Sequence, residues 1–205
     1  MAMRHLKILL AAAAALLPGL AQAQFNFAPG TYQAANGAKG SASLKLALAE
    51  GGQPTRMVGI KNDDERTFRS AQVVAFTTDG HRFVQIKDFR FRLGTDAGFK
   101  DPALLEVLET GAVELFYYYY LVDMGPSITA HVKLPVLRKA GTTTFFAYSP
   151  GRTPGLDPKL APNGFVASLF PADPVLQKQF AAKAVTRAQL AAVVRAYNQG
   201  VRLSH

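Results

Sequence analysis

The chain has 205 residues, of which 49% are hydrophobic, and a formal net charge of +9. It contains no cysteine, which excludes disulfides, thiol nucleophiles and cysteine metal sites. Its length fits one domain with a sizeable core, and it has no clustered basic run of the kind that binds nucleic acid.

The first 23 residues have the form of a cleaved secretory signal. Arg4 and Lys7 precede an apolar run over residues 8–20, and residues 21–23 read Ala-Gln-Ala, a small-x-small peptidase site. The run is shorter than the about 20 residues that span a bilayer. We therefore expect cleavage before Gln24, no transmembrane segment in the mature protein, and a periplasmic, surface-associated or secreted location.

The charge of the mature chain points to anionic partners. The leader holds two of the 23 basic residues and none of the 14 acidic ones, so 21 basic residues face 14 acidic ones and the mature charge is +7. Such a field favours encounter with anions but does not specify a ligand. The expected partners are an anionic envelope component, namely a lipid head group, lipopolysaccharide or an acidic glycan, or an envelope protein.

Residues 24–148 are expected to form a β-rich domain, because apolar residues recur there with period two between turn signals. The expected strands are 42–48, 56–60, 71–76, 82–93, 113–120, 128–137 and 142–148. Short turns, such as Asp79-Gly80, favour an antiparallel sheet, either a meander or a small barrel-like sheet. With the helices expected at the C-terminus, the fold class is α+β.

The apolar pattern changes its facing within one expected strand. Apolar positions are even-numbered over residues 81–87 and odd-numbered over residues 88–93. A bulge or bend is required near Lys87-Asp88 if both halves form one strand. Beyond the switch, Arg90 and Arg92 share the solvent face with Asp88. That face fits either the charged outside of a half-exposed strand or an anion-binding stripe.

Residues 101–109 fit either a short helix or a strand. We favour the strand because Gly111 and the aromatic run after it look like the far arm of a hairpin. The run contains Tyr117, Tyr118, Tyr119 and Tyr120, which places two phenols on each face of a strand. These rings would pack within the sheet or stack on sugar rings or a partner. Together with Arg90 and Arg92 they are the candidate binding residues.

The last part of the chain is expected to be a connector followed by helices. A proline takes the second place of each quartet over residues 149–164, so residues 149–170 are predicted as a Pro/Gly-rich loop and connector. Disorder, a plain connection and a binding lid all fit this segment. Residues 171–205 are predicted as a helical hairpin that packs on the same domain, with starts at Asp173-Pro174 and at a capping box over residues 186–189.

Three stretches carry a resemblance to a known family. They are a Gly-rich opening over residues 29–40, an apolar run with Gly and Leu-Phe-Tyr over residues 104–117, and the ending Tyr197-Asn198 one helix after Asp173-Pro174. Together they resemble a family of exported β-rich proteins of unknown function from Bacteroidota-type bacteria. Many relatives carry a cysteine beside each tail position, which this chain lacks. The resemblance implies location and architecture but no activity.

The sequence assigns no catalytic residue, cofactor or metal site. His81 and His131 lie in no spaced catalytic motif, and His205 is at the terminus. The acidic cluster at residues 62–65 lacks the spacing of a calcium loop and is interpreted as a solvated turn. The expected function is a non-enzymatic binding or structural module of the envelope. The alternative is a small periplasmic hydrolase of an envelope polymer, with His81 or His131 as base.

Overall fold

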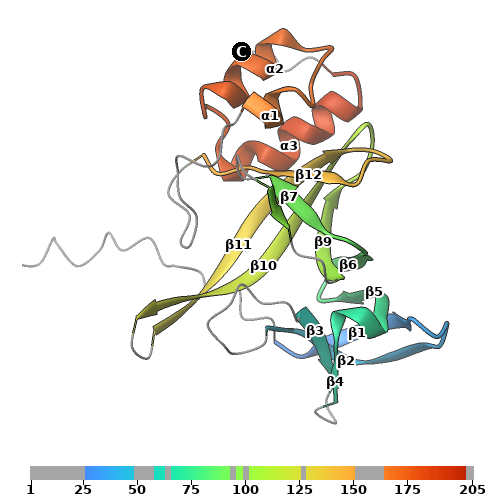
Figure 1. The fold of residues 1–205 in the computed structure, drawn as a ribbon. Coiled ribbons are helices and arrows are strands. Elements are labelled where there is room, and N and C mark those ends of the chain that lie inside the picture. The colour runs from blue at the N-terminus through green and yellow to red at the C-terminus, as the bar shows by residue number, and fades with distance from the viewer. Residues whose placement is uncertain are drawn as a thin grey trace, which may run out of the picture.

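The protein folds into one sheet with helices at one end. The computed structural model describes residues 26–48, 58–62, 66–92, 96–98, 102–125, 128–150 and 164–201. Within these residues the strands form a single, mostly antiparallel sheet, and three α-helices gather over its upper end (Figure 1). The expected α+β class is confirmed. The expected signal peptide and the proline quartets from residue 151 to residue 163 lie outside the described residues.

Twelve described strands pair in the order β4-β3-β2-β1-β5-β6-β9-β10-β11-β12-β7-β8. Their bounds are β1 Ala28–Ala34, β2 Lys39–Leu48, β3 Val58–Asn62, β4 Thr67–Phe68, β5 Val73–Thr78, β6 His81–Ile86, β7 Arg90–Arg92, β8 Asp96–Gly98, β9 Ala103–Glu109, β10 Val113–Gly125, β11 Ile128–Lys139 and β12 Thr144–Ala147. A 3-10 turn, η1 (Ser70–Gln72), leads into β5. Neighbouring strands are antiparallel except β12 and β7, which pair in parallel.

The expected strands are present, except that the strand expected over residues 82–93 is divided into β6 and β7. Residues 103–109 form a strand, not a helix. Three of the described strands were not predicted, namely β1, β4 and β8. Of these, β1 lies between β2 and β5, although it contains Pro29 and Gly30, which disfavour strands. Gly30 is required there because a Cβ would lie 2.1 Å from the carbonyl oxygen of Thr77. The close approach of the β1 and β5 backbones therefore explains why a glycine, which by itself suggests a turn, lies within a strand here.

The predicted change of facing after β6 is confirmed. Asp88 has a φ of 53°, and the chain turns there between β6 and β7. Phe89, which is fully buried, then packs in the same cluster as Val84 and Ile86, although it has an odd number and they have even numbers. Because β6 pairs with β9 and β7 pairs with β12, this bent segment reaches from one side of the central strands to the other.

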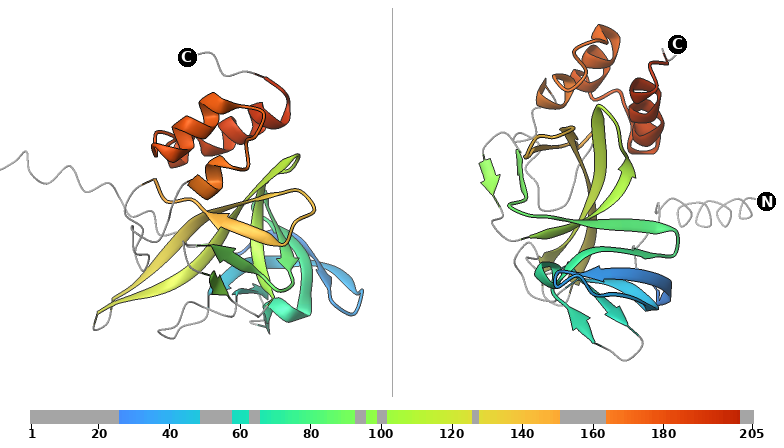
Figure 2. Two further views of the ribbon diagram at one scale, coloured as in Figure 1. Left: turned by 45° about the horizontal axis from the view of Figure 1, so that its top comes forward. Right: turned by 90° about the vertical axis from the view of Figure 1, so that its right-hand side faces the viewer.

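Both faces of the central strands are buried. On one face, Phe89, Tyr118 and Phe145 form the centre of an aromatic cluster. On the other face, the helices cover a helix-side cluster that includes Leu115, and β1 to β6 cover an N-terminal cluster that includes Leu104. Figure 2 shows the helices and the N-terminal strands at opposite ends of the central strands. All three clusters therefore pack against the central strands.

Two of the three helices in the described residues begin where local capping predicts. The bounds are α1 Gly164–Ala167, α2 Pro174–Ala181 and α3 Arg187–Asn198. The carboxylate of Asp173 accepts hydrogen bonds from two backbone N–H groups of α2, and Thr186 forms the capping box of α3. Helix α1 corrects the expectation of a connector up to residue 170, because Val166 and Phe170 are buried beneath the helical hairpin. No helix in the described part of the chain is long and apolar enough to cross a membrane.

Candidate functional site

Three of the four candidate tyrosines lie inside the protein, and Tyr117 is half-buried. Tyr118 and Tyr120 face the aromatic cluster, whereas Tyr117 and Tyr119 face the N-terminal cluster, so the expected two rings per face are present. However, Tyr118, Tyr119 and Tyr120 are at most 4% exposed. Rings so deeply buried cannot stack on a sugar or partner, and the binding role considered for them is corrected to core packing. Both faces of β10 are covered, which an alternating pattern alone does not reveal.

Burial also fixes the protonation of these phenols. It raises the pKa of Tyr118, Tyr119 and Tyr120 well above the usual value of 10. For Tyr119, the negative charge of Glu106 and a hydrogen bond to it raise the pKa further. The phenols therefore remain neutral hydrogen-bond donors in ordinary conditions.

The structure does not place the candidate arginines beside the tyrosines. Arg90 is exposed on β7, opposite Thr144 of β12 and Gly98 of β8. Strand β11 separates β12 from β10, which carries the tyrosines. Arg92 pairs through its backbone with Phe146, and its side chain lies outside the described part. The expected surface combining the arginines with the tyrosines is therefore absent from the described residues.

A polar network that the sequence did not reveal surrounds Glu106, which is only 3% exposed. The His81 Nδ1 atom lies 2.6 Å from one carboxylate oxygen, and the Tyr119 hydroxyl donates to the other. The Lys133 Nζ atom lies 3.6 Å from the carboxylate and 3.9 Å from the ring centre of Tyr117. Strands β6, β9, β10 and β11 thus converge on one buried charge, which we name the Glu106 network.

The two candidate histidines differ in their hydrogen-bond contacts. The side chain of His81 is 37% exposed and contacts the buried carboxylate through Nδ1, so its ring orientation is fixed and Nε2 points away from Glu106. By contrast, the Nδ1 atom of His131 is buried and has no hydrogen-bond partner among the described residues. Of the two, only His81 has the contact that would orient a general base.

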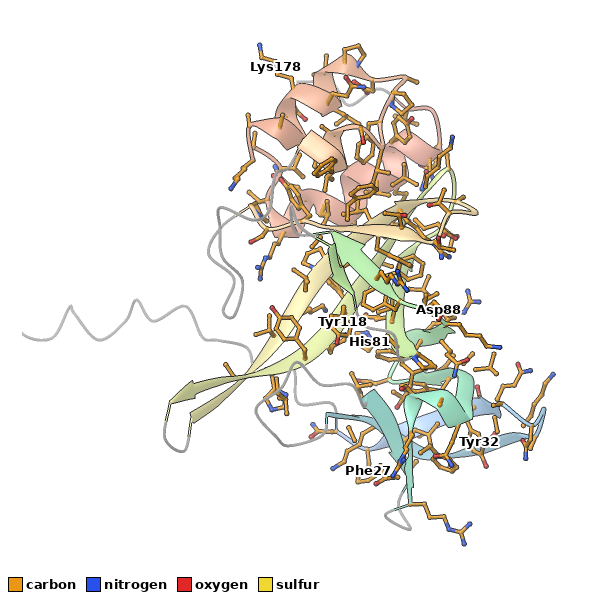
Figure 3. The ribbon with its side chains drawn as sticks, in the orientation of Figure 1. Phe27, Tyr32, His81, Asp88, Tyr118 and Lys178 are labelled. Carbon is orange, nitrogen blue, oxygen red and sulfur yellow. The ribbon has the colours of Figure 1, made fainter. Side chains whose placement is uncertain are left out.

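A groove of about 460 Å³ crosses the outer face of the N-terminal strands. Its lining residues are Thr31, Tyr32, Gln33, Lys39, Gly40, Ser41, Ala75, Phe76, Thr77 and Arg82. Figure 3 places Tyr32 on these strands, below His81. Lys39 and Arg82 are the charged residues of this lining, and both are exposed. The groove therefore presents two cations and no carboxylate.

The groove was missed because its members are far apart in the chain. Ser41 lies opposite Thr31, Thr31 lies opposite Thr77, and Thr77 lies opposite Arg82. The first two pairings depend on β1, a strand that the pattern did not predict. The only sign of the groove in the local sequence is that polar residues alternate with apolar ones in β2 and β5. Such alternation is ordinary for an exposed sheet face and does not indicate a groove.

No protein-family model, curated protein or solved structure matches the chain. Among the residues that the structure describes, no group of three side chains is placed to hold a metal ion.

Proposed function

We propose that the chain is an exported envelope protein that binds an anionic envelope component and does not act on it chemically. The observation that carries the proposal is the charge of the groove. Lys39 and Arg82 have no acidic partner among the described residues, whereas Lys133, Arg138 and Arg195 are each paired with a glutamate. The first two cations are thus available to a ligand.

Electrostatics gives the proposal its measurable property. Exposed cations attract an anion across the solvent, and salt screens that attraction beyond a Debye length of about 8 Å. The mature charge of +7, from 21 basic and 14 acidic residues, adds a field of the same sign. The leader supports the choice of an envelope component over a cytoplasmic one, since its tripartite form is that of an export signal.

Two matched double variants test the groove. Lys39→Ser with Arg82→Ser removes the groove cations, and Arg90→Ser with Arg92→Ser removes the same charge from β7. Co-sedimentation of the mature protein with lipopolysaccharide should weaken about tenfold or more in the first variant and much less in the second, since each surface cation contributes about 1 kcal/mol near an anionic surface. Equal losses, or retention that does not depend on salt, would overturn the proposal.

A second function, hydrolysis of an envelope polymer, is favoured by one contact. His81 Nδ1 lies 2.6 Å from the buried carboxylate of Glu106, and a carboxylate at this nitrogen is what orients the histidine of hydrolytic triads. Turnover of purified envelope polymer by the wild type, lost in His81→Gln and kept in His131→Gln, would support it. Absence of turnover by the wild type would exclude it for that polymer.

A further inference from the structure

We propose that the groove over β2, β1, β5 and β6 binds an extended acidic polysaccharide. This inference rests on the proposed function, which assigns the groove an anionic ligand, and it names the chemical class of that ligand. Three features carry it: a row of hydroxyl groups across the strands, cations beside that row, and an exposed aromatic ring beyond the groove.

The hydroxyl row is set by strand register. Ser41, Thr31 and Thr77 are directly opposed on three adjacent strands, so their hydroxyl groups span about 10 Å at the usual strand spacing. Arg82 lies opposite Thr77 on the fourth strand and extends the row to about 14 Å. The Thr31 and Thr77 hydroxyl oxygens lie 2.9 Å apart, and the Thr77 oxygen also accepts a hydrogen bond from the Thr31 backbone N–H at 3.4 Å. Each hydroxyl both donates and accepts, so these bonds leave further capacity for the hydroxyl groups of a sugar. The span suits several linked sugars better than a single small anion.

The cations flank this row. Arg82 closes it on β6, and Lys39 lies one step along, opposite Gln33 of β1. A guanidinium donates a planar pair of N–H groups that matches a carboxylate, and the ammonium of Lys39 adds a second charge. A chain of uronate sugars carries a carboxylate on successive units, so it offers an anion to each cation while its hydroxyls meet the row between them.

The apolar lining residues point away from the groove, which disfavours a lipid. Phe76 is 2% exposed and stacks on Phe83 at 4.4 Å within the N-terminal cluster. Tyr32 packs on Phe68 in the same cluster. These two residues therefore border the groove chiefly with their backbones, and Ala75 is the apolar side chain left on its face. Acyl chains would find little surface to contact.

An exposed ring lies beyond the groove, four residues before Thr31 in the chain. Phe27 is 40% exposed, and the Lys45 Nζ atom lies 4.4 Å from its ring centre. Lys45 shares the outer face of β2 with Lys39 and Ser41, because side chains two residues apart point to the same side. Figure 3 shows Phe27 to the left of Tyr32 on these strands. An aromatic ring beside a cation can stack on the apolar face of a sugar while the cation meets its carboxylate.

Binding of the mature protein to four immobilised probes tests the inference: polygalacturonate, neutral dextran, polyglutamate and phosphatidylglycerol vesicles. We expect polygalacturonate to bind about tenfold or more tightly than dextran. Phe27→Ala should weaken polygalacturonate binding about fivefold and leave polyglutamate binding unchanged, as expected for one aromatic contact. Val175→Ala, which removes another exposed hydrophobic side chain on α2, should change neither.

The hydroxyl row is tested by Thr31→Val with Thr77→Val, which keeps the branched shape of both side chains. This double variant should weaken polygalacturonate binding about tenfold while the binding of polyglutamate persists. If polyglutamate or the vesicles bind as tightly as polygalacturonate and the Phe27 and threonine variants have no effect, the polysaccharide assignment is wrong and the groove remains an anion site. If no anionic probe binds, both proposals fail.

Discussion

Replacing Asn198 with alanine should loosen the attachment of α3 to the sheet. The Asn198 side chain accepts a hydrogen bond from Val113 N–H at 2.9 Å and donates one to the Val113 carbonyl at 2.8 Å. It thereby continues the ladder at the start of β10, where Val113 is 1% exposed. A hydrogen bond contributes about 1 kcal/mol net, and a buried donor left without a partner costs about 1–3 kcal/mol, so we expect a loss of about 2–3 kcal/mol.

Urea denaturation of the mature protein measures this loss. Gln199→Ala is the matched control, because Gln199 is exposed and caps α3 through its backbone. Its effect should stay within about 0.5 kcal/mol. Gly111→Ala should act like Asn198→Ala, since a Cβ there would lie 2.5 Å from Asn198 Cγ and φ is +152°. A free energy of unfolding that Asn198→Ala leaves unchanged would refute the idea that this side chain fastens α3.

Three further outcomes are expected. Burial raises the pKa of Tyr148 to about 12 from 10. The stability that neutral Tyr148 contributes is therefore intact below pH 10 and is lost between pH 10 and about 12, at up to about 1.4 kcal/mol per pH unit. Urea midpoints measured across this range check the loss, and a flat profile would contradict it. Gly30→Ala should destabilise the fold by more than about 2 kcal/mol, because its Cβ would meet a backbone carbonyl, and a wild-type melting temperature would show otherwise. Exported protein should have the intact mass of a chain that begins at Gln24, and retention of the leader would disprove the predicted cleavage.

Local chemistry predicted the features that depend on neighbours in sequence. Period-two alternation located most strands, and side-chain caps located the starts of α2 and α3. The bend at Asp88 was predicted from the change between even-numbered and odd-numbered apolar positions alone. In contrast, β1 was missed because its glycine and proline disfavour a strand, and only pairing on both sides with β2 and β5 overrides that preference.

The candidate site was less accessible to sequence reasoning because it depends on pairing between distant segments. Alternation placed two tyrosines on each face of the strand. It could not show that other parts of the chain cover both faces, which would be exposed in a single hairpin. Glu106 occupies an inward position between Leu104 and Leu108, and a carboxylate at such a position is the one signal that a buried network was present. Its partners on β6 and β11 are recognisable only once the strand order is known.

The most direct test of the groove is a nuclear magnetic resonance titration of the ¹⁵N-labelled mature protein with oligogalacturonate. The largest amide shift changes should fall on Thr31, Gln33, Ser41 and Thr77, and they should shrink as salt is raised. Shift changes centred on Arg90 of β7 or on His81, with the four groove amides unmoved, would contradict binding in the groove.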